Sequence, residues 1–204
     1  MNDSAIFLRT VSEVTELTYK GLKNENRETI SKAKKDTKKL KKQTTILISN
    51  IFNAVKNLQE DDVKKDRRYG KVIASIQSIY NNAKSINQKC YDHLDNNHKK
   101  PTNQQFDELK KLNDLLNVQI TESGKIFTDK DFSAIEKFTQ TVEEFKQRMQ
   151  EFDENQLQRI KAGSSTTRGS LLYLGLLADS ESLSNDIVEL VNVCKKNYEG
   201  FSKK

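Results

Sequence analysis

The sequence predicts an all-α protein of six long antiparallel helices, arranged as two repeated three-helix bundles. Its 204 residues include one proline and seven glycines, too few for the many turns of a β protein. Apolar residues recur at steps of three and four along most of the chain, which is the period of one helix face. Matching apolar stripes in the two halves of the chain also indicate an internal repeat.

The first three helices follow from their own apolar stripes. The first stripe runs from Phe7 to Leu22, and the polar segment KNENRE ends it. A second, longer helix is expected over 26–58. The third stripe extends from Val72 to Leu94 and ends at NNHKKP, where the only proline of the chain stands.

The second half repeats this pattern. A fourth stripe runs from Phe106 to Ile120, and we expect the segment GKIFTDKD to end that helix. A fifth helix is expected over 130–161, with Phe132 and Ile160 on its apolar stripe. The segment GSSTTRG separates it from a sixth stripe between Leu176 and Tyr198.

The two halves match at nearly constant offsets. Moving the second helix by 105 positions brings its apolar residues onto those of the fifth, so that Leu40 falls on Phe145. Moving the third helix by 104 positions brings Ile79 onto Leu183. Two matches at nearly one offset predict a duplication. We therefore expect one elongated domain made of two three-helix repeats, 1–98 and 102–204.

The composition favours a soluble chain in a reducing compartment. Mean hydropathy is −0.80, and no apolar run approaches the roughly 18 residues that a membrane span needs. No secretory signal peptide is recognisable at the N-terminus. Two cysteines do not form a disulfide framework, which fits the cytoplasm.

The positive charge is concentrated in the second helix. The net charge is +6, and the segment SKAKKDTKKLKK contains seven lysines but only one acidic residue, Asp36. One interpretation is a solvated helix face without a partner. The other is a docking surface for an acidic partner: a membrane surface, an acidic protein face or nucleic acid. Nucleic acid is the least favoured, because no arginine run or aromatic residue accompanies the lysines. The expected docking residues are Lys34, Lys35, Lys38, Lys41 and Lys42.

The segment CYDHLDNNHKKP holds both histidines of the chain, so it is either a metal site or the end of a helix. His93 and His98 are five residues apart, whereas helical zinc sites use a spacing of four. The two asparagines tolerate the left-handed conformation that ends helices, and Pro101 cannot continue one. Thr102 can then cap the next helix. These features favour the helix end.

No catalytic motif is recognisable elsewhere. The chain has no glycine-rich phosphate loop, no G-x-S-x-G motif and no cysteine–histidine pair at a working spacing. We therefore expect a protein that is not an enzyme.

Four segments resemble a known family. They are NLQEDD (57–62), YGKVIASI (69–76), HLDNNHKKP (93–101) and TTRGSLLYL (166–174). With the two three-helix repeats, they resemble the PhoU family, and more closely the PhoU-like C-terminal cytoplasmic domain of bacterial sodium/phosphate symporters of the Bacteroidetes type. The segments HLDNNHKKP and RGSLLYL are the most specific of these.

The resemblance implies a PhoU-like fold and a non-enzymatic regulatory role in sodium-coupled uptake of inorganic phosphate and in phosphate homeostasis. The implied partner is a phosphate transporter or its transmembrane portion, at the inner face of the cell membrane. Contact with an anionic membrane surface or with a second copy of the chain is also expected. The alternative function is a basic helical module that binds nucleic acid or acts as a scaffold.

The resemblance also bears on metal binding. Family members commonly carry a Glu-x-x-x-Asp pattern in the third helix of each repeat, which can hold iron or other metal ions. The first repeat has Gln77 and Asn81 at these positions, and the second has Glu181 and Asn185, followed by Asp186. Amides bind such cations far more weakly than carboxylates do. We therefore expect no cofactor and no tightly bound metal, with Glu181 and Asp186 as weak candidate ligands.

Overall fold

The computed structural model describes residues 2–56, 63–128 and 133–201, and every regular element in these ranges is an α-helix. The all-α, six-helix prediction is confirmed. Within these ranges, no helix combines the length and the apolar character needed to cross a bilayer. The helices are α1 (Asn2–Lys23), α2 (Arg27–Lys56), α3 (Val63–Asp95), α4 (Asn103–Thr128), α5 (Ala134–Lys161) and α6 (Thr167–Phe201).

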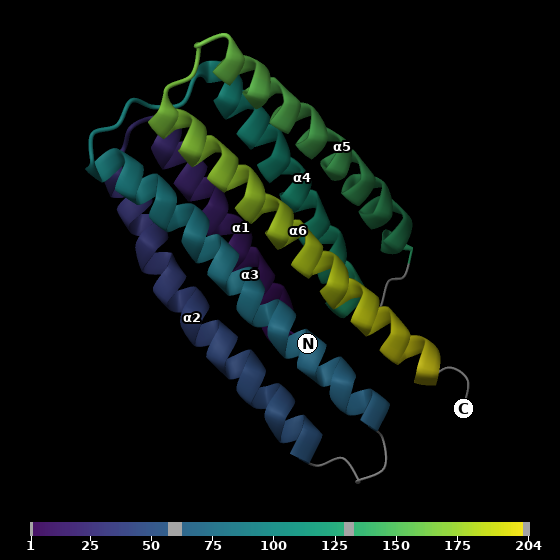
Figure 1. Cartoon of the computed structure of the whole chain (residues 1–204). Coiled ribbons are helices and arrows are strands. Elements are labelled where there is room, and N and C mark those ends of the chain that lie inside the picture. Colours follow the sequence, from purple (N-terminus) through teal and green to yellow (C-terminus); the bar gives the residue numbers. More distant parts are fainter. Residues whose placement is uncertain (1, 57–62, 129–132, 202–204) are drawn as a thin grey trace.

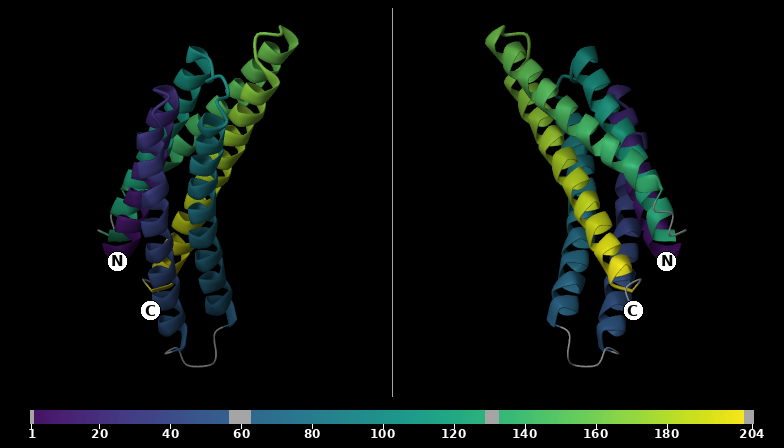
Figure 2. Two further views of the ribbon diagram at one scale, coloured as in Figure 1. Left: turned by 90° about the vertical axis from the view of Figure 1, so that its left-hand side faces the viewer. Right: turned by 90° about the vertical axis from the view of Figure 1, so that its right-hand side faces the viewer.

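Four of the helices form a central bundle, and two lie outside it. Helices α1, α3, α6 and α4 pack in a closed ring, in which α3 with α6 is the most extensive pair. Helix α2 packs on α1 and α3, whereas α5 packs on α4 and α6 (Figure 1). Figure 2 shows the molecule from the side of α2 in its left view and from the side of α5 in its right view. Because α2 and α5 each have neighbours on one side only, both present a broad face to solvent.

The contacts between the halves join residues at the offsets found in the sequence. Ser12 Oγ of α1 donates a hydrogen bond to Asn117 Oδ1 of α4, 105 residues away, at 2.7 Å. Asn82 Nδ2 of α3 donates to Asp186 Oδ2 of α6, 104 residues away, at 2.9 Å. Equivalent residues of two repeats meet in this way near a two-fold axis. The division into repeats 1–98 and 102–204 stays a prediction that these contacts motivate.

Three tight turns lie together at one end of the bundle (Figure 1). Helices α1, α3 and α5 each end before a residue in the left-handed region: Glu25 (φ 50°), Asn97 (φ 54°) and Gly163 (φ 64°). At the end of α3, the His98 N–H donates to the His93 carbonyl at 3.1 Å. This six-to-one hydrogen bond is typical of the Schellman helix end, which satisfies otherwise unpaired carbonyls.

The following helices begin with side-chain caps at the same end. Asn26 Oδ1 accepts a backbone N–H in the first turn of α2 at 2.9 Å. Thr102 and Gln105 form a reciprocal capping box at the start of α4, with hydrogen bonds of 2.9 and 3.2 Å. Thr166 Oγ1 caps α6 at 3.1 Å. The predicted cap at Thr102 is therefore confirmed, and the three turns are held by local hydrogen bonds.

The fourth helix ends inside the predicted segment but runs past its glycine. We expected GKIFTDKD to end this helix, and α4 continues through Gly124 and ends at Thr128. An isolated glycine costs a helix about 1 kcal/mol relative to alanine. Ile126 and Phe127 are 1% and 8% exposed. Burying two such side chains contributes about 1.5–3 kcal/mol each, which outweighs that cost. Residues 57–58 of the predicted second helix, and Phe132 of the predicted fifth helix, lie outside the described residues.

Candidate functional site

The predicted basic surface lies on the outer face of α2, which we call the α2 lysine face (Lys34, Lys35, Lys38, Lys41 and Lys42). Four of its five lysines are exposed. The opposite face of α2 is buried against α1 and α3 through residues such as Ile30 and Leu40, which are fully buried. None of the five lysines forms an ion pair with a described residue. The face therefore carries positive charge that the described part of the fold does not neutralise.

Lys34 differs from the other four lysines of the face. It is half-buried, because its ammonium group lies 3.8 Å from the ring centre of Tyr91 on α3. A cation over an aromatic face contributes about 0.5–1 kcal/mol at a surface site. Lys34 thus helps to hold α2 on α3, and the other four lysines form the accessible part of the face.

The degenerate metal positions lie on α3 and α6. Gln77 and Asn81 are exposed, and the Gln77 amide donates to Asn81 Oδ1 at 3.3 Å along the helix. Glu181 and Asn185 are exposed on α6. Among the described residues, no three histidine, cysteine, aspartate or glutamate side chains converge into a group that could hold a metal ion.

Asp186 is half-buried at the contact between α3 and α6. Burial raises the pKa of its carboxyl group, while the Asn82 hydrogen bond at 2.9 Å acts in the opposite direction. The same bond joins the two halves of the molecule. Asp186 therefore acts as part of the packing between the halves.

The segment with both histidines forms the end of α3, as predicted. The His93 side chain is 5% exposed, and its Nε2 atom lies 2.8 Å from the Lys99 carbonyl oxygen. The imidazole N–H thus satisfies a backbone acceptor of the turn. The two histidine rings touch edge to face with centroids 5.2 Å apart, because His98 lies beyond the helix end. A spacing of five residues therefore does not keep the two rings apart at this helix end.

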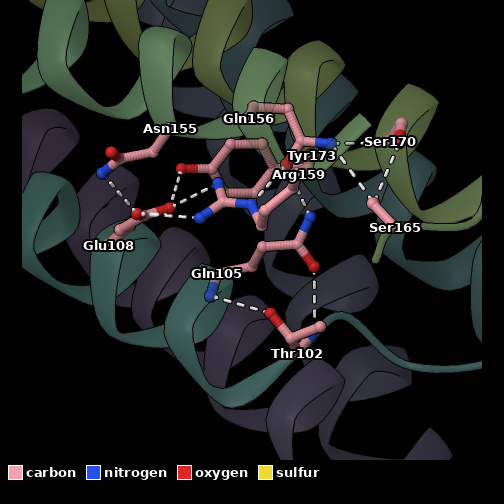
Figure 3. Close-up of polar contacts among 9 residues, drawn as sticks. All are labelled: Thr102, Gln105, Glu108, Asn155, Gln156, Arg159, Ser165, Ser170 and Tyr173. Carbon is pink, nitrogen blue, oxygen red and sulfur yellow. Dashed lines mark hydrogen bonds and ion pairs between the residues drawn. The ribbon is translucent and has the colours of Figure 1, made fainter. Parts of the chain in front are cut away.

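The most extensive polar cluster was not predicted. We call it the Glu108 cluster; it links α4, α5 and α6 close to the three turns (Figure 3). Glu108 accepts two hydrogen bonds from the Arg159 guanidinium group, at 3.0 and 2.7 Å. It also accepts hydrogen bonds from Tyr173 and, at 2.9 Å, from Asn155. Glu108 and Arg159 are 6% and 8% exposed, so this is a buried ion pair with its hydrogen bonds satisfied.

A second layer of amides and hydroxyls surrounds this pair. Gln156 Oε1 accepts from Gln105 at 2.8 Å and from the Arg159 Nε–H at 2.9 Å. Gln156 Nε2 donates to Ser165 and Ser170 at 3.2 and 3.0 Å. Figure 3 shows these residues pointing toward one another from the helix ends. The capping box of α4 and the turn before α6 are therefore tied to the buried ion pair.

The cluster corrects the expected stripe of the fifth helix. Ile160 was expected on the apolar stripe, but it is 44% exposed, and its neighbour Arg159 is buried. Gln156 and Arg159 continue the spacing of three and four from Phe152 into the buried face. The sequence did contain a signal for this cluster. Gln156 and Arg159 are polar residues at stripe positions of the fifth helix, and Glu108 lies among the apolar residues of the fourth helix.

The cluster is suited to packing rather than to reaction. Burial and the neighbouring Glu108 carboxylate raise the pKa of Tyr173, so this hydroxyl remains a donor.

Cys90 lies on the predicted apolar stripe of α3, and burial raises the pKa of its thiol. A buried thiol that stays protonated is a poor nucleophile.

Comparison of the chain with models of protein families, with curated proteins and with solved structures gave no match.

Proposed function

We propose that this protein is a non-enzymatic, PhoU-like regulatory module of inorganic phosphate uptake, which docks through the α2 lysine face. The proposal combines the resemblance of the sequence with the placement of its carrying segments. HLDNNHKKP forms the turn between α3 and α4, and RGSLLYL forms the first turns of α6 at the same end of the bundle. Tyr173 of the second segment belongs to the Glu108 cluster.

The exposed lysines of α2 are the observation that carries the docking part of the proposal. Lys35, Lys38 and Lys42 are exposed and lie on the side of α2 opposite its buried stripe. Near an anionic surface, each lysine contributes about 1 kcal/mol, within a screening length of ~8 Å at physiological salt. The proposed docking partner is a phosphate transporter, and the anionic lipid headgroups around it present negative charge. A partner of this kind supports a proposed location at the inner face of the cell membrane.

A regulatory role fits the way the interior uses its polar groups. Glu108, Arg159 and Tyr173 satisfy one another, and His93 bonds to a backbone carbonyl. Amides at Gln77 and Asn81 favour a module without a metal cofactor. We propose that such a module acts by contact with its partner.

The docking partner is tested by crosslinking in cells, with the phosphate transporter recovered and quantified. The test variant is Lys35→Glu/Lys38→Glu/Lys42→Glu. The matched control, Lys20→Glu/Lys84→Glu/Lys161→Glu, makes the same change of charge at exposed lysines of α1, α3 and α5.

We expect the first variant to lose transporter crosslinks and the control to keep them. Equal loss in both variants would mean that net charge alone matters, and would overturn docking by the α2 lysine face. Crosslinking of the unaltered protein to nucleic acid in place of the transporter, with strong salt dependence, would favour the alternative function.

A further inference from the structure

The outer face of α2 carries exposed apolar side chains beside its lysines. Ile46 is 54% exposed and Phe52 is 53% exposed. Both follow the lysine-rich part of the helix, in its C-terminal half. Single exposed apolar side chains are ordinary, but two large ones that extend a basic face are typical of interfacial helices.

Helical geometry places these side chains on the solvent side. With about 100° per residue, Ile46 projects within roughly 40° of Lys35 and Lys42. Phe52 projects within roughly 40° of Lys38 and about 120° from Ile46, so the two apolar side chains lie at opposite edges of the lysine face. From Lys35 to Phe52 the face is about 26 Å long at 1.5 Å per residue. The long methylene stems of the lysines allow their ammonium groups to reach outward while apolar neighbours enter a surface.

We propose that the outer face of α2 binds an anionic lipid surface, with Ile46 and Phe52 entering the boundary between headgroups and acyl chains. This inference rests on the proposed function, since it names the surface on which the α2 lysine face docks. Lysines supply long-range attraction to phosphate and carboxylate headgroups. The two apolar side chains supply the contact that a purely electrostatic encounter lacks.

The chemistry of the face favours lipid over the other acidic partners. Its cations are all lysines, which act as point charges, whereas bidentate recognition of single carboxylates or phosphates favours arginine. A nucleic-acid backbone offers phosphates but no apolar phase for Ile46. The only acidic residue in the segment, Asp36, is half-buried and so does not interrupt the exposed face.

The chain contains no tryptophan, so one introduced at the surface reports on its own surroundings. The experiment uses the full chain carrying Phe52→Trp, titrated with vesicles of phosphatidylcholine alone or mixed with phosphatidylserine. We expect a blue shift of the emission, and quenching by brominated acyl chains, with the anionic vesicles only. The matched control is Leu171→Trp, because Leu171 is 63% exposed and lies on α6, away from the outer face of α2. It should not shift.

Two further variants, measured by vesicle sedimentation, separate the apolar contribution to binding from the electrostatic one. Ile46→Ser/Phe52→Ser should weaken binding to anionic vesicles by about tenfold, since the apolar contact of two large side chains is lost. Leu157→Ser/Leu171→Ser should leave it unchanged. Binding by the unaltered chain should fall steeply as salt is raised.

Two outcomes would overturn the inference. One is vesicle binding that Ile46→Ser/Phe52→Ser leaves unchanged. The other is no vesicle binding at all, while transporter crosslinking through the α2 lysine face persists. In the second case the proposed function stands, and its partner is an acidic protein surface.

Discussion

The Glu108 cluster provides a stability prediction whose size follows from its geometry. Replacing Arg159 with methionine removes the guanidinium group and leaves the Glu108 carboxylate buried, with hydrogen bonds from Tyr173 and Asn155 but no counter-charge. Breaking a buried pair in this way costs about 3–5 kcal/mol. A domain of this kind is stable by about 5–15 kcal/mol in total. The change should therefore lower the unfolding temperature by roughly 6–20 °C, since 1 kcal/mol corresponds to about 2–4 °C at this size.

The double variant Glu108→Gln/Arg159→Met separates lost charge pairing from lost packing. Glutamine carries no charge and keeps one acceptor oxygen. Because Tyr173 donates to Oε2 of Glu108 and Asn155 to Oε1, that oxygen keeps one of these two hydrogen bonds. We expect the double variant to be more stable than Arg159→Met alone, by about 1–3 kcal/mol. The assay is urea unfolding followed by circular dichroism. If Arg159→Met costs less than about 1 kcal/mol, or if the effects of the two single variants simply add, then the pair is not coupled as the structure implies.

Three further predictions concern the helix ends, the close contact between α1 and α2, and metal content. Burial lowers the pKa of His93 from its ordinary value of 6.5, so the unfolded chain binds this proton more readily, and stability should fall as the pH drops below about 6.5. His93→Gln should flatten that dependence in pH-resolved thermal unfolding; an unchanged slope would exclude His93 as its source. Gly21→Ala should destabilise by about 1–3 kcal/mol, because an added Cβ would lie 2.4 Å from Ile30 Cγ1, whereas Gly124→Ala in open space should not destabilise. Elemental analysis of purified protein should find no stoichiometric iron or zinc; metal that is lost on Glu181→Gln would contradict this.

The sequence was sufficient to predict the helices because their apolar periods are regular. The stripe of α2, from Ile30 through Leu40 to Leu47, is buried as its spacing predicts. The turn after α3 was also predictable, since two asparagines and a proline leave few alternatives. Local chemistry determines both features, and it can be read one segment at a time.

The Glu108 cluster could not be predicted in the same way. Its members come from three helices, and the polar residues Gln156 and Arg159 on the stripe of α5 do not by themselves identify their partners on α4 and α6. Whether Arg159 or Ile160 faces the core depends on how α5 is rotated about its axis against α4. The spacing of apolar residues does not decide between these two neighbouring positions. The extension of α4 past Gly124 likewise depends on burial of Ile126 and Phe127 by other helices.

The α2 lysine face was predictable as a charged face, but Lys34 was not. Its half-buried position depends on Tyr91 of α3, which is 57 residues away in the sequence. The exposure of Ile46 and Phe52 could not be predicted either, because an apolar residue inside an amphipathic helix is ordinarily assigned to the core. Their exposure depends on the tertiary structure, because α2 has neighbours on only one side.

Regulation of phosphate uptake through the α2 lysine face can be measured in cells whose chromosomal gene carries Lys35→Glu/Lys38→Glu/Lys42→Glu. Uptake of labelled phosphate is measured after a shift from scarce to abundant phosphate. The Lys20→Glu/Lys84→Glu/Lys161→Glu strain serves as the control at matched protein abundance. We expect the first strain to lose the normal adjustment of uptake and the control strain to keep it. Normal adjustment of uptake in both strains, with the altered protein folded and abundant, would contradict a regulatory role exerted through the α2 lysine face.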